Sequence, residues 1–246
     1  MRIIKLSVIL SILAIGLTAC MKSPSKPPEV SLESLFQKVI ESPPSPAEAR
    51  IIGGKIDSLF SSIADIDQEY VKQISAIKWG DVYDPKSLNQ KSKLPALRKV
   101  NSDSKNLCLI TFEKRRKLYN EFISDLEKLS SKSIFAEAML LDFKEKYNEA
   151  ETGFLEIEKG MQESTIEKHD LIDAKLAMLL QAPGKYEMLS DGQIKFYQDA
   201  RGIELMVGYT ENMKKHNQLT DRQRTLGNFF VKNRQNVVNR FHELSH

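Results

Sequence analysis

The sequence holds few cysteines, glycines and prolines, and one long apolar run. Two cysteines in 246 residues exclude a scaffold held together by several disulfides. The 11 glycines and 9 prolines are too few for a collagen-like or low-complexity chain. With 41% hydrophobic and 28% charged residues, the chain has the composition of a folded protein that can bury a core. Its formal charge of +3 is too small to indicate a nucleic-acid binder by itself.

The motifs of several enzyme classes are also missing. The sequence contains no glycine-rich phosphate loop, no Gly-x-Ser-x-Gly and no Cys-x-x-Cys. Acidic pairs four residues apart are frequent, but any solvated helix offers them and they carry no specificity. We therefore expect no cofactor, and no catalytic residue is predicted.

The single long apolar run lies at the N-terminus. Arg2 and Lys5 precede about a dozen mostly apolar residues, and this run is shorter than the roughly 20 residues of a membrane span. A positive start followed by such a run is typical of a signal peptide. It ends in Leu17-Thr18-Ala19-Cys20, which resembles the lipobox of bacterial lipoproteins. The alternative is an ordinary secretory signal whose cleavage site precedes a cysteine.

The lipobox resemblance implies a location. The resemblance implies that the Cys20 thiol carries a diacylglycerol and that residues 1–19 are removed. More than one acyl chain gives stable attachment to a membrane. Met21 stands where aspartate retains enterobacterial lipoproteins in the inner membrane, so the resemblance favours the outer membrane, facing the periplasm. Loss of Arg2 and Lys5 leaves 34 basic against 33 acidic residues, a charge of +1.

The predicted organisation has three parts: a signal peptide over 1–19, a lipidated Cys20 with a proline-rich tether over 20–30, and one helical periplasmic domain over 31–246. Proline-rich chain extends by about 3.1 Å per residue, so the tether would reach roughly 30 Å.

Helical spacing dominates the domain. Ser31 is the predicted N-cap of a short helix that ends at Pro43. Ser45 is the predicted N-cap of a long helix from 46 to about 78, although the low helix propensity of Gly53-Gly54 disfavours the start of this helix. Residues 79–105 follow no long pattern. Further helices are expected over 106–130, from 134 to a stop at Gly160, from Ser164 to about 180, and near 199–216 and 221–244.

A change of period interrupts the helices near 186–197. Two alternating runs flank Asp191-Gly192, a dipeptide that strongly favours a β-hairpin turn. The fold class predicted is mainly α: long antiparallel helices packed as a bundle, with one accessory hairpin. The lipobox, the paired helices and the late hairpin together are faintly similar to a family of uncharacterised enterobacterial lipoproteins, a resemblance that implies no activity.

The last five residues carry one recognisable chemical motif. His242, Glu243 and His246 match His-Glu-x-x-His, in which two histidines bind zinc and the glutamate activates water. The chain ends before a third ligand could follow, and Leu244 continues the apolar stripe of its helix. Packing is therefore the preferred interpretation, and a zinc-dependent hydrolase is the alternative.

The other candidate residues have plain interpretations. With Cys20 acylated, Cys108 has no partner in the chain, and we expect a buried, apolar cysteine rather than an intermolecular disulfide. His169 and His216 are expected to be isolated and exposed.

Charge is unevenly distributed along the domain. Residues 86–117 carry +8, residues 120–175 carry −7 and residues 214–246 carry +5. Helices of opposite charge lying side by side would explain this, and the alternative is a basic surface for an envelope protein, peptidoglycan or anionic lipid headgroups. No nucleic acid is expected in this compartment. The function predicted is a non-catalytic interaction or structural role, and a carrier of a small apolar ligand between the helices is a third possibility.

Overall fold

The computed structural model describes residues 31–182, 184–190, 193–197 and 200–245, with the backbone alone at 242, 244 and 245. The predicted signal peptide, Cys20 and the tether lie outside the described residues. So do the Asp191-Gly192 turn and His246.

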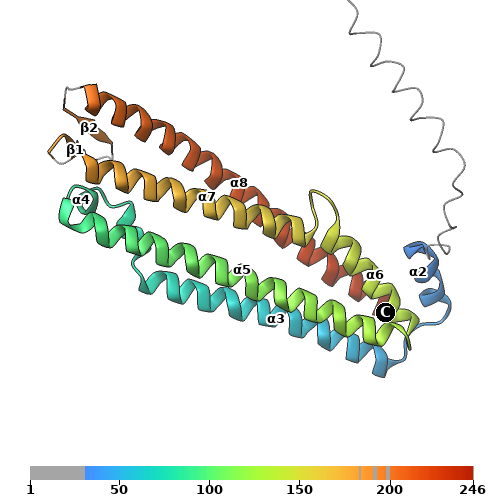
Figure 1. Ribbon diagram of the computed structural model, residues 1–246. Helices are drawn as coiled ribbons and strands as arrows, with labels where there is room; N and C mark the ends of the chain where they lie inside the picture. Colours follow the sequence, from blue (N-terminus) through green and yellow to red (C-terminus); the bar gives the residue numbers. More distant parts are fainter. Residues whose placement is uncertain (1–30, 183, 191–192, 198–199, 246) are drawn as a thin grey trace, which may run out of the picture.

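Four long helical segments run back and forth to form an antiparallel bundle (Figure 1). They are α3 (Pro46–Ala76), α5 (Leu94–Ser130), α6 (Ile134–Asn148) continued by α7 (Phe154–Gln181), and α8 (Ala200–Ser245). The short α2 (Leu32–Glu41) packs on α6 at one end. At 1.5 Å per residue, the 37 residues of α5 span about 55 Å. The predicted mainly α bundle is confirmed.

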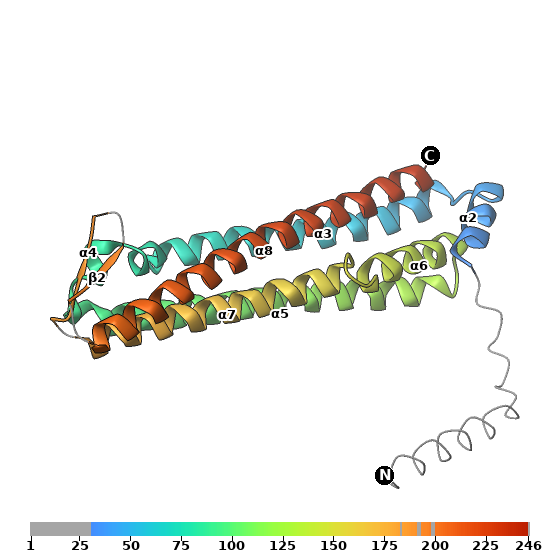
Figure 2. The same cartoon turned by 90° about the horizontal axis from the view of Figure 1, so that it is seen from above.

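Helix α8 crosses the bundle diagonally. It packs along α7 and reaches α3 near its own C-terminal end, as seen from above (Figure 2). There the ring of Phe241 lies against Gly53, where a Cβ atom would approach the ring to 2.6 Å. Glycine has a low intrinsic propensity for helix, but at position 53 the absence of a side chain leaves room for the Phe241 ring. Further along, the Arg234 guanidinium donates to the Phe60 carbonyl at 3.2 Å.

The helix starts predicted at Ser31 and Ser45 are observed. The hydroxyls of Ser31 and Ser45 each accept a hydrogen bond at 3.2 Å from the backbone N–H three residues later. Pro46 occupies the first turn of α3, where its missing N–H costs no hydrogen bond.

Two separate apolar cores stabilise the bundle. The core at the α2 end contains an aromatic cluster in which Tyr119 stacks on Phe154 at 5.6 Å between ring centroids. The core at the opposite end joins α5, α7 and the hairpin, and its members include Val82, Leu94, Leu176, Leu179 and Ile194.

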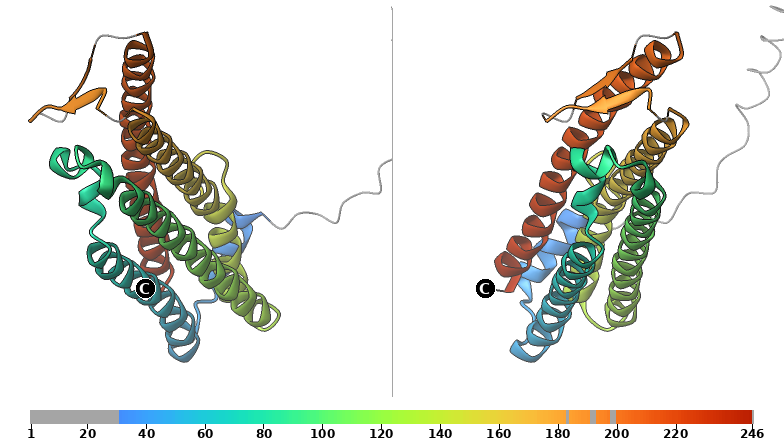
Figure 3. Two further views of the ribbon diagram at one scale, coloured as in Figure 1. Left: turned by 60° about the vertical axis from the view of Figure 1, so that its left-hand side comes forward. Right: turned by 90° about the vertical axis from the view of Figure 1, so that its left-hand side faces the viewer.

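The hairpin closes the second core. Strands β1 (Tyr186–Met188) and β2 (Ile194–Phe196) pair antiparallel, with Tyr186 opposite Phe196. The Tyr186 hydroxyl donates to the Leu88 carbonyl at 3.2 Å, which joins β1 to α4 (Pro85–Leu88). Seen from this end, the hairpin lies across α8 and the α4 segment (Figure 3). The predicted accessory hairpin is confirmed.

The boundaries of two predicted helices are wrong. Residues 79–105 are more ordered than expected: η1 (Trp79–Val82), α4 and η2 (Lys91–Lys93) lead into α5, which begins at Leu94 rather than 106. Pro95 falls in the first turn of α5, where proline starts a helix instead of ending one. The helix expected from 134 to Gly160 is interrupted earlier, where Glu151 adopts a left-handed φ of 72°.

Two predicted helix ends do not exist. Gly160 lies inside α7, and a Cβ atom there would meet a Leu226 methyl at 3.1 Å, so the glycine serves the α7–α8 packing. Ser164 is buried and donates to the Leu219 carbonyl at 3.2 Å instead of capping a new helix. The two helices expected near 199–216 and 221–244 are one continuous helix, α8, in which the Thr220 hydroxyl donates to the His216 carbonyl one turn earlier.

Candidate functional site

A polar layer separates the two apolar cores. Its buried polar side chains come from α5 and α7: Asn101, Ser104 and Thr111 on α5, and Glu158, Ser164, Thr165, His169 and Lys175 on α7. Ser164, Thr165 and Lys175 contact residues of α8. Burying a polar group without a hydrogen-bond partner costs free energy of folding. A concentration of buried polar groups at mid-bundle is therefore a candidate functional site.

His169 is the best-paired member of the layer. Its Nδ1 lies 2.8 Å from Asn101 Oδ1, and the Asn101 amide donates to the His169 carbonyl at 2.8 Å. The Trp79 ring covers the imidazole at 4.7 Å between centroids. The side chain is 5% exposed, so the prediction of an exposed histidine is wrong. Burial, with Lys168 and Lys105 nearby, lowers its pKa to about 4.

Lys175 is the least-paired member. Its Nζ lies 5.5 Å from the Tyr83 ring centroid and 5.8 Å from that of Tyr209, and the residue is 4% exposed. Burial alone lowers its pKa to about 8, and within the described part of the chain no carboxylate pairs with it. The structure therefore holds an ammonium group against two aromatic faces without a counter-charge.

His216 faces the same region from α8. Its ring lies 5.6 Å from Tyr83, and burial together with Lys168 and Lys175 lowers its pKa to about 4. It is half-buried, so the expectation of an exposed, isolated side chain is wrong here too. A small, partly open pocket of about 10 Å³ lies between α7 and α8 at this level, lined by Leu171, Ile172, Lys175, Asn212, Met213 and His216.

A second charged cluster lies nearer the α2 end. The Arg115 Nε donates to Asp67 Oδ1 at 2.9 Å, and the guanidinium lies 4.0 Å from Glu158 Oε1. Glu158 is 5% exposed, and burial raises its pKa to about 7 although Arg115 opposes the shift. Glu158 Oε1 and the Tyr119 hydroxyl have no hydrogen-bond partner among the described residues. This arrangement makes the charge of Glu158 sensitive to pH.

Replacing Glu158 by glutamine should change how stability depends on pH. The folded chain holds a proton on Glu158 up to about pH 7, whereas the ordinary glutamate pKa is 4.5, so its contribution to the free energy of unfolding falls as pH rises from 4.5 through 7. The stability of Glu158→Gln relative to the unmodified chain should therefore rise by about 3 kcal/mol between pH 4.5 and pH 8.

Urea unfolding of both proteins across that pH range measures the difference. His169 and His216 have pKa values lowered from 6.5 to about 4, so they weaken the fold as pH falls through that window. They do so in both proteins, and subtraction removes their effect. Parallel pH profiles would contradict the assignment.

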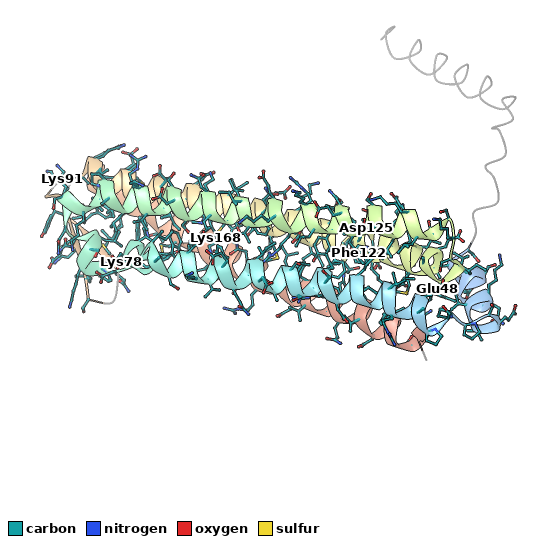
Figure 4. The ribbon with its side chains drawn as sticks, turned by 90° about the horizontal axis from the view of Figure 1, so that it is seen from below. Glu48, Lys78, Lys91, Phe122, Asp125 and Lys168 are labelled. Carbon is teal, nitrogen blue, oxygen red and sulfur yellow. The ribbon has the colours of Figure 1, made fainter. Side chains whose placement is uncertain are left out.

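A cluster of unpaired lysines covers the hairpin end of the bundle. We call Lys78, Lys86, Lys91 and Lys93 the tip lysines; all four are exposed. None of them forms an ion pair with a described residue. The carboxylate of Asp84 caps α4, and Asp81 is exposed. Figure 4 shows Lys78 and Lys91 at this end of the bundle and Glu48 at the other.

The predicted zinc motif is only partly described. Glu243 is exposed and accepts a hydrogen bond from Arg240 at 2.8 Å, while the side chain of His242 and the whole of His246 lie outside the described part. Within that part, no group of three or more His, Cys, Asp or Glu side chains could hold a metal ion. Nor is any helix there long and apolar enough to cross a membrane. The zinc hydrolase stays a prediction.

Cys108 has the environment expected of a buried cysteine. It is 8% exposed, and the Tyr70 hydroxyl lies 3.1 Å from its sulfur. Burial raises the pKa of its thiol, which keeps the group protonated and unreactive.

Comparison with models of protein families, with curated proteins and with solved structures finds no match to this chain. The geometry of the molecule is therefore the ground for a functional proposal.

Proposed function

We propose that this protein is a lipid-anchored component of the bacterial envelope that acts without catalysis, holding a basic tip away from its membrane to bind the carboxylates of peptidoglycan. The observation that carries the proposal is the position of two features at opposite ends of the bundle. The described chain starts at Ser31 beside α2, whereas the tip lysines cover the end formed by η1, α4 and η2.

The length of the bundle separates the two ends. The 37 residues of α5 run from the tip to the α2 end, about 55 Å. A membrane anchor on Cys20, as the lipobox resemblance implies, would attach the domain at the α2 end. The tip would then face away from that membrane.

Charge and distance together favour peptidoglycan over the headgroups of the anchoring membrane. Electrostatic attraction between exposed charges fades beyond a Debye length of about 8 Å at physiological salt, far less than the length of the bundle. Unpaired lysines at the tip therefore attract whatever anionic material lies beyond it. Peptidoglycan carries carboxylates in its peptide stems and fills the space that such a tip would reach.

Reversing the charge of the tip should remove this binding. A variant with Lys86, Lys91 and Lys93 each replaced by glutamate is expected to bind purified peptidoglycan sacculi roughly 100-fold more weakly, at about 1 kcal/mol per lysine facing an anionic surface. The measurement is co-sedimentation of the protein with sacculi at two salt concentrations. Binding of the unmodified protein should weaken as salt rises.

The matched control reverses three lysines away from the tip. Lys38, Lys132 and Lys232 are exposed and form no ion pair with a described residue. Their replacement by glutamate changes the net charge by the same amount and should leave sacculus binding within about twofold. Equal losses in both variants, or binding of the unmodified protein to anionic vesicles but not to sacculi, would contradict the proposal.

A further inference from the structure

One buried acidic side chain at the α2 end of the bundle has no partner among the described residues. Asp142 of α6 is 4% exposed, and its neighbours in sequence, Leu141 and Phe143, belong to the apolar core or pack against it. Its carboxylate forms no ion pair and accepts no hydrogen bond from a described residue. Burying a carboxylate without a partner costs free energy of folding. The described chain therefore leaves Asp142 without the partner that a buried charge requires.

The Asp142 carboxylate is open to a pocket rather than sealed in the core. In the described part of the chain, the fully enclosed side-chain N and O atoms without a hydrogen-bond partner belong to Tyr119, Glu158 and Asn233. The Asp142 oxygens are not among them although they also lack a partner, so solvent reaches them. Asp142 lines an open pocket of about 420 Å³ where α2, α6 and α8 meet (Figure 2).

The lining of this pocket is one positive charge short. Asp142, Glu145 and Glu243 contribute three carboxylates, against the two basic groups of Lys146 and Arg240. Arg240 donates to Glu243 at 2.8 Å, and Lys146 pairs with a glutamate outside the pocket. Neither basic group forms an ion pair with Asp142. Burial raises the pKa of Asp142 although Arg240 and Lys146 oppose the shift, so a cation bound beside it would stabilise the charged form.

The walls around Asp142 indicate what kind of cation fits. Leu32 and Phe36 of α2 give the pocket an apolar side. An ammonium group on an aliphatic stem matches both surfaces, because its N–H groups donate to a carboxylate and its methylenes pack on apolar side chains.

Two other classes of cation match the pocket less well. Within the described part of the chain, no three His, Cys, Asp or Glu side chains are grouped so as to hold a metal ion. A quaternary ammonium has no N–H to donate and is bound chiefly by aromatic faces. The ring of Phe36 already has a cation, since the Arg240 guanidinium lies 4.1 Å from its centroid. The pocket therefore favours a cation that donates hydrogen bonds.

We propose that this pocket binds a primary ammonium group on a short aliphatic stem, with the ammonium donating to Asp142 and the stem packing on Leu32 and Phe36. The site lies at the opposite end of the bundle from the tip lysines and does not depend on the proposed function. Two sources carry this chemistry: a free aliphatic amine and the ethanolamine headgroup of a phospholipid. Only the second source rests on the proposed function, in which the α2 end faces the anchoring membrane.

The test is titration of the isotope-labelled full chain with butylammonium at constant ionic strength, followed by the backbone amide shifts in NMR spectra. Saturable shifts are expected at the residues that line the pocket. Tetramethylammonium has the same charge but no N–H group, so it should bind at least about 10-fold more weakly. Equal affinities for the two cations, or no saturable shift with butylammonium, would overturn the proposal.

A third titration distinguishes the two sources. Glycerophosphoethanolamine carries the same primary ammonium together with the phosphate of the lipid headgroup. Tighter binding than that of butylammonium would support the site and assign it to the headgroup, and weaker binding would support it and assign it to a free amine. The variant in which glutamate replaces Lys86, Lys91 and Lys93 should bind butylammonium as the unmodified chain does, whether or not the tip binds peptidoglycan.

Asp142→Asn locates the effect. The variant keeps the shape of the side chain and removes its charge, so it should be at least as stable as the unmodified chain and should bind butylammonium at least about 10-fold more weakly. Asp65→Asn removes an exposed carboxylate of α3 that has no ion pair to a described residue, and it should change the affinity by less than about twofold. Unchanged affinity in Asp142→Asn would contradict the site. If that variant fails to fold, the comparison of butylammonium with tetramethylammonium on the unmodified chain still decides.

Discussion

Replacing Arg115 by methionine is expected to lower the free energy of unfolding by about 3–5 kcal/mol at pH 8, because the buried Glu158 and its neighbour Asp67 then lose their shared cation. Methionine keeps an apolar stem in place of the Arg115 side chain and removes the guanidinium, which lies 5.8 Å from the ring centroids of Phe112 and Phe230. The loss therefore measures the charge rather than the packing. Equilibrium unfolding in urea provides the value.

The same variant should lose less at pH 6. Glu158, with a pKa of about 7, is mostly protonated at pH 6, so removing the positive charge of Arg115 lowers the free energy of unfolding by a smaller amount. Lys114 offers a matched control: it precedes Arg115 on α5, it is exposed, and Lys114→Met should change stability by no more than about 0.5 kcal/mol. A similar cost for Arg115→Met and Lys114→Met would show that the buried cluster is not formed.

Phe230→Ala should cost about 3–5 kcal/mol, the usual range for truncating a buried phenylalanine. Phe230 is 6% exposed and meets Phe154 edge to face, at 5.6 Å between centroids. Through this contact α8 joins the aromatic cluster of the core at the α2 end. Urea unfolding again measures the change.

Its neighbour in sequence is the control. Phe229 is 39% exposed, and Phe229→Ala should cost less than about 1 kcal/mol. Adjacent helical residues point about 100° apart, so the pair reports the rotation of α8 about its axis. Equal costs at 229 and 230 would mean that α8 presents a different face to the bundle.

The sequence predicts the helical bundle and the hairpin because both depend on local patterns. Serine caps at Ser31 and Ser45, proline at Pro46 and the alternation around 186–197 all act within a few residues. The wrong boundaries come from contacts between distant residues. The sequence suggests that Gly160 ends a helix, but in the structure the absence of a side chain there makes room for Leu226. It also suggests that Ser164 caps a helix, whereas the Ser164 hydroxyl donates to the carbonyl of Leu219.

The polar layer was harder to predict for the same reason. His169 precedes the buried Ile172 and Leu176 by three and seven residues, a helical spacing that would have placed it inside. Lys175 has no such signal, since a lysine in a helix is normally exposed. Only the packing of α7 against α8 and Tyr83 shows that its charge is buried without a partner.

The most direct test of the proposed function joins the two ends of the molecule in one assay. The acylated protein is reconstituted in neutral vesicles, mixed with purified sacculi and sedimented, and the vesicle lipid that sediments with the sacculi is measured. The unmodified protein should carry vesicles down, whereas Cys20→Ser should leave them in solution for lack of the anchor. The variant in which glutamate replaces Lys86, Lys91 and Lys93 should also leave the vesicles in solution, because the tip has lost its positive charge. Lipid that sediments equally with all three proteins, or with none, would contradict the account.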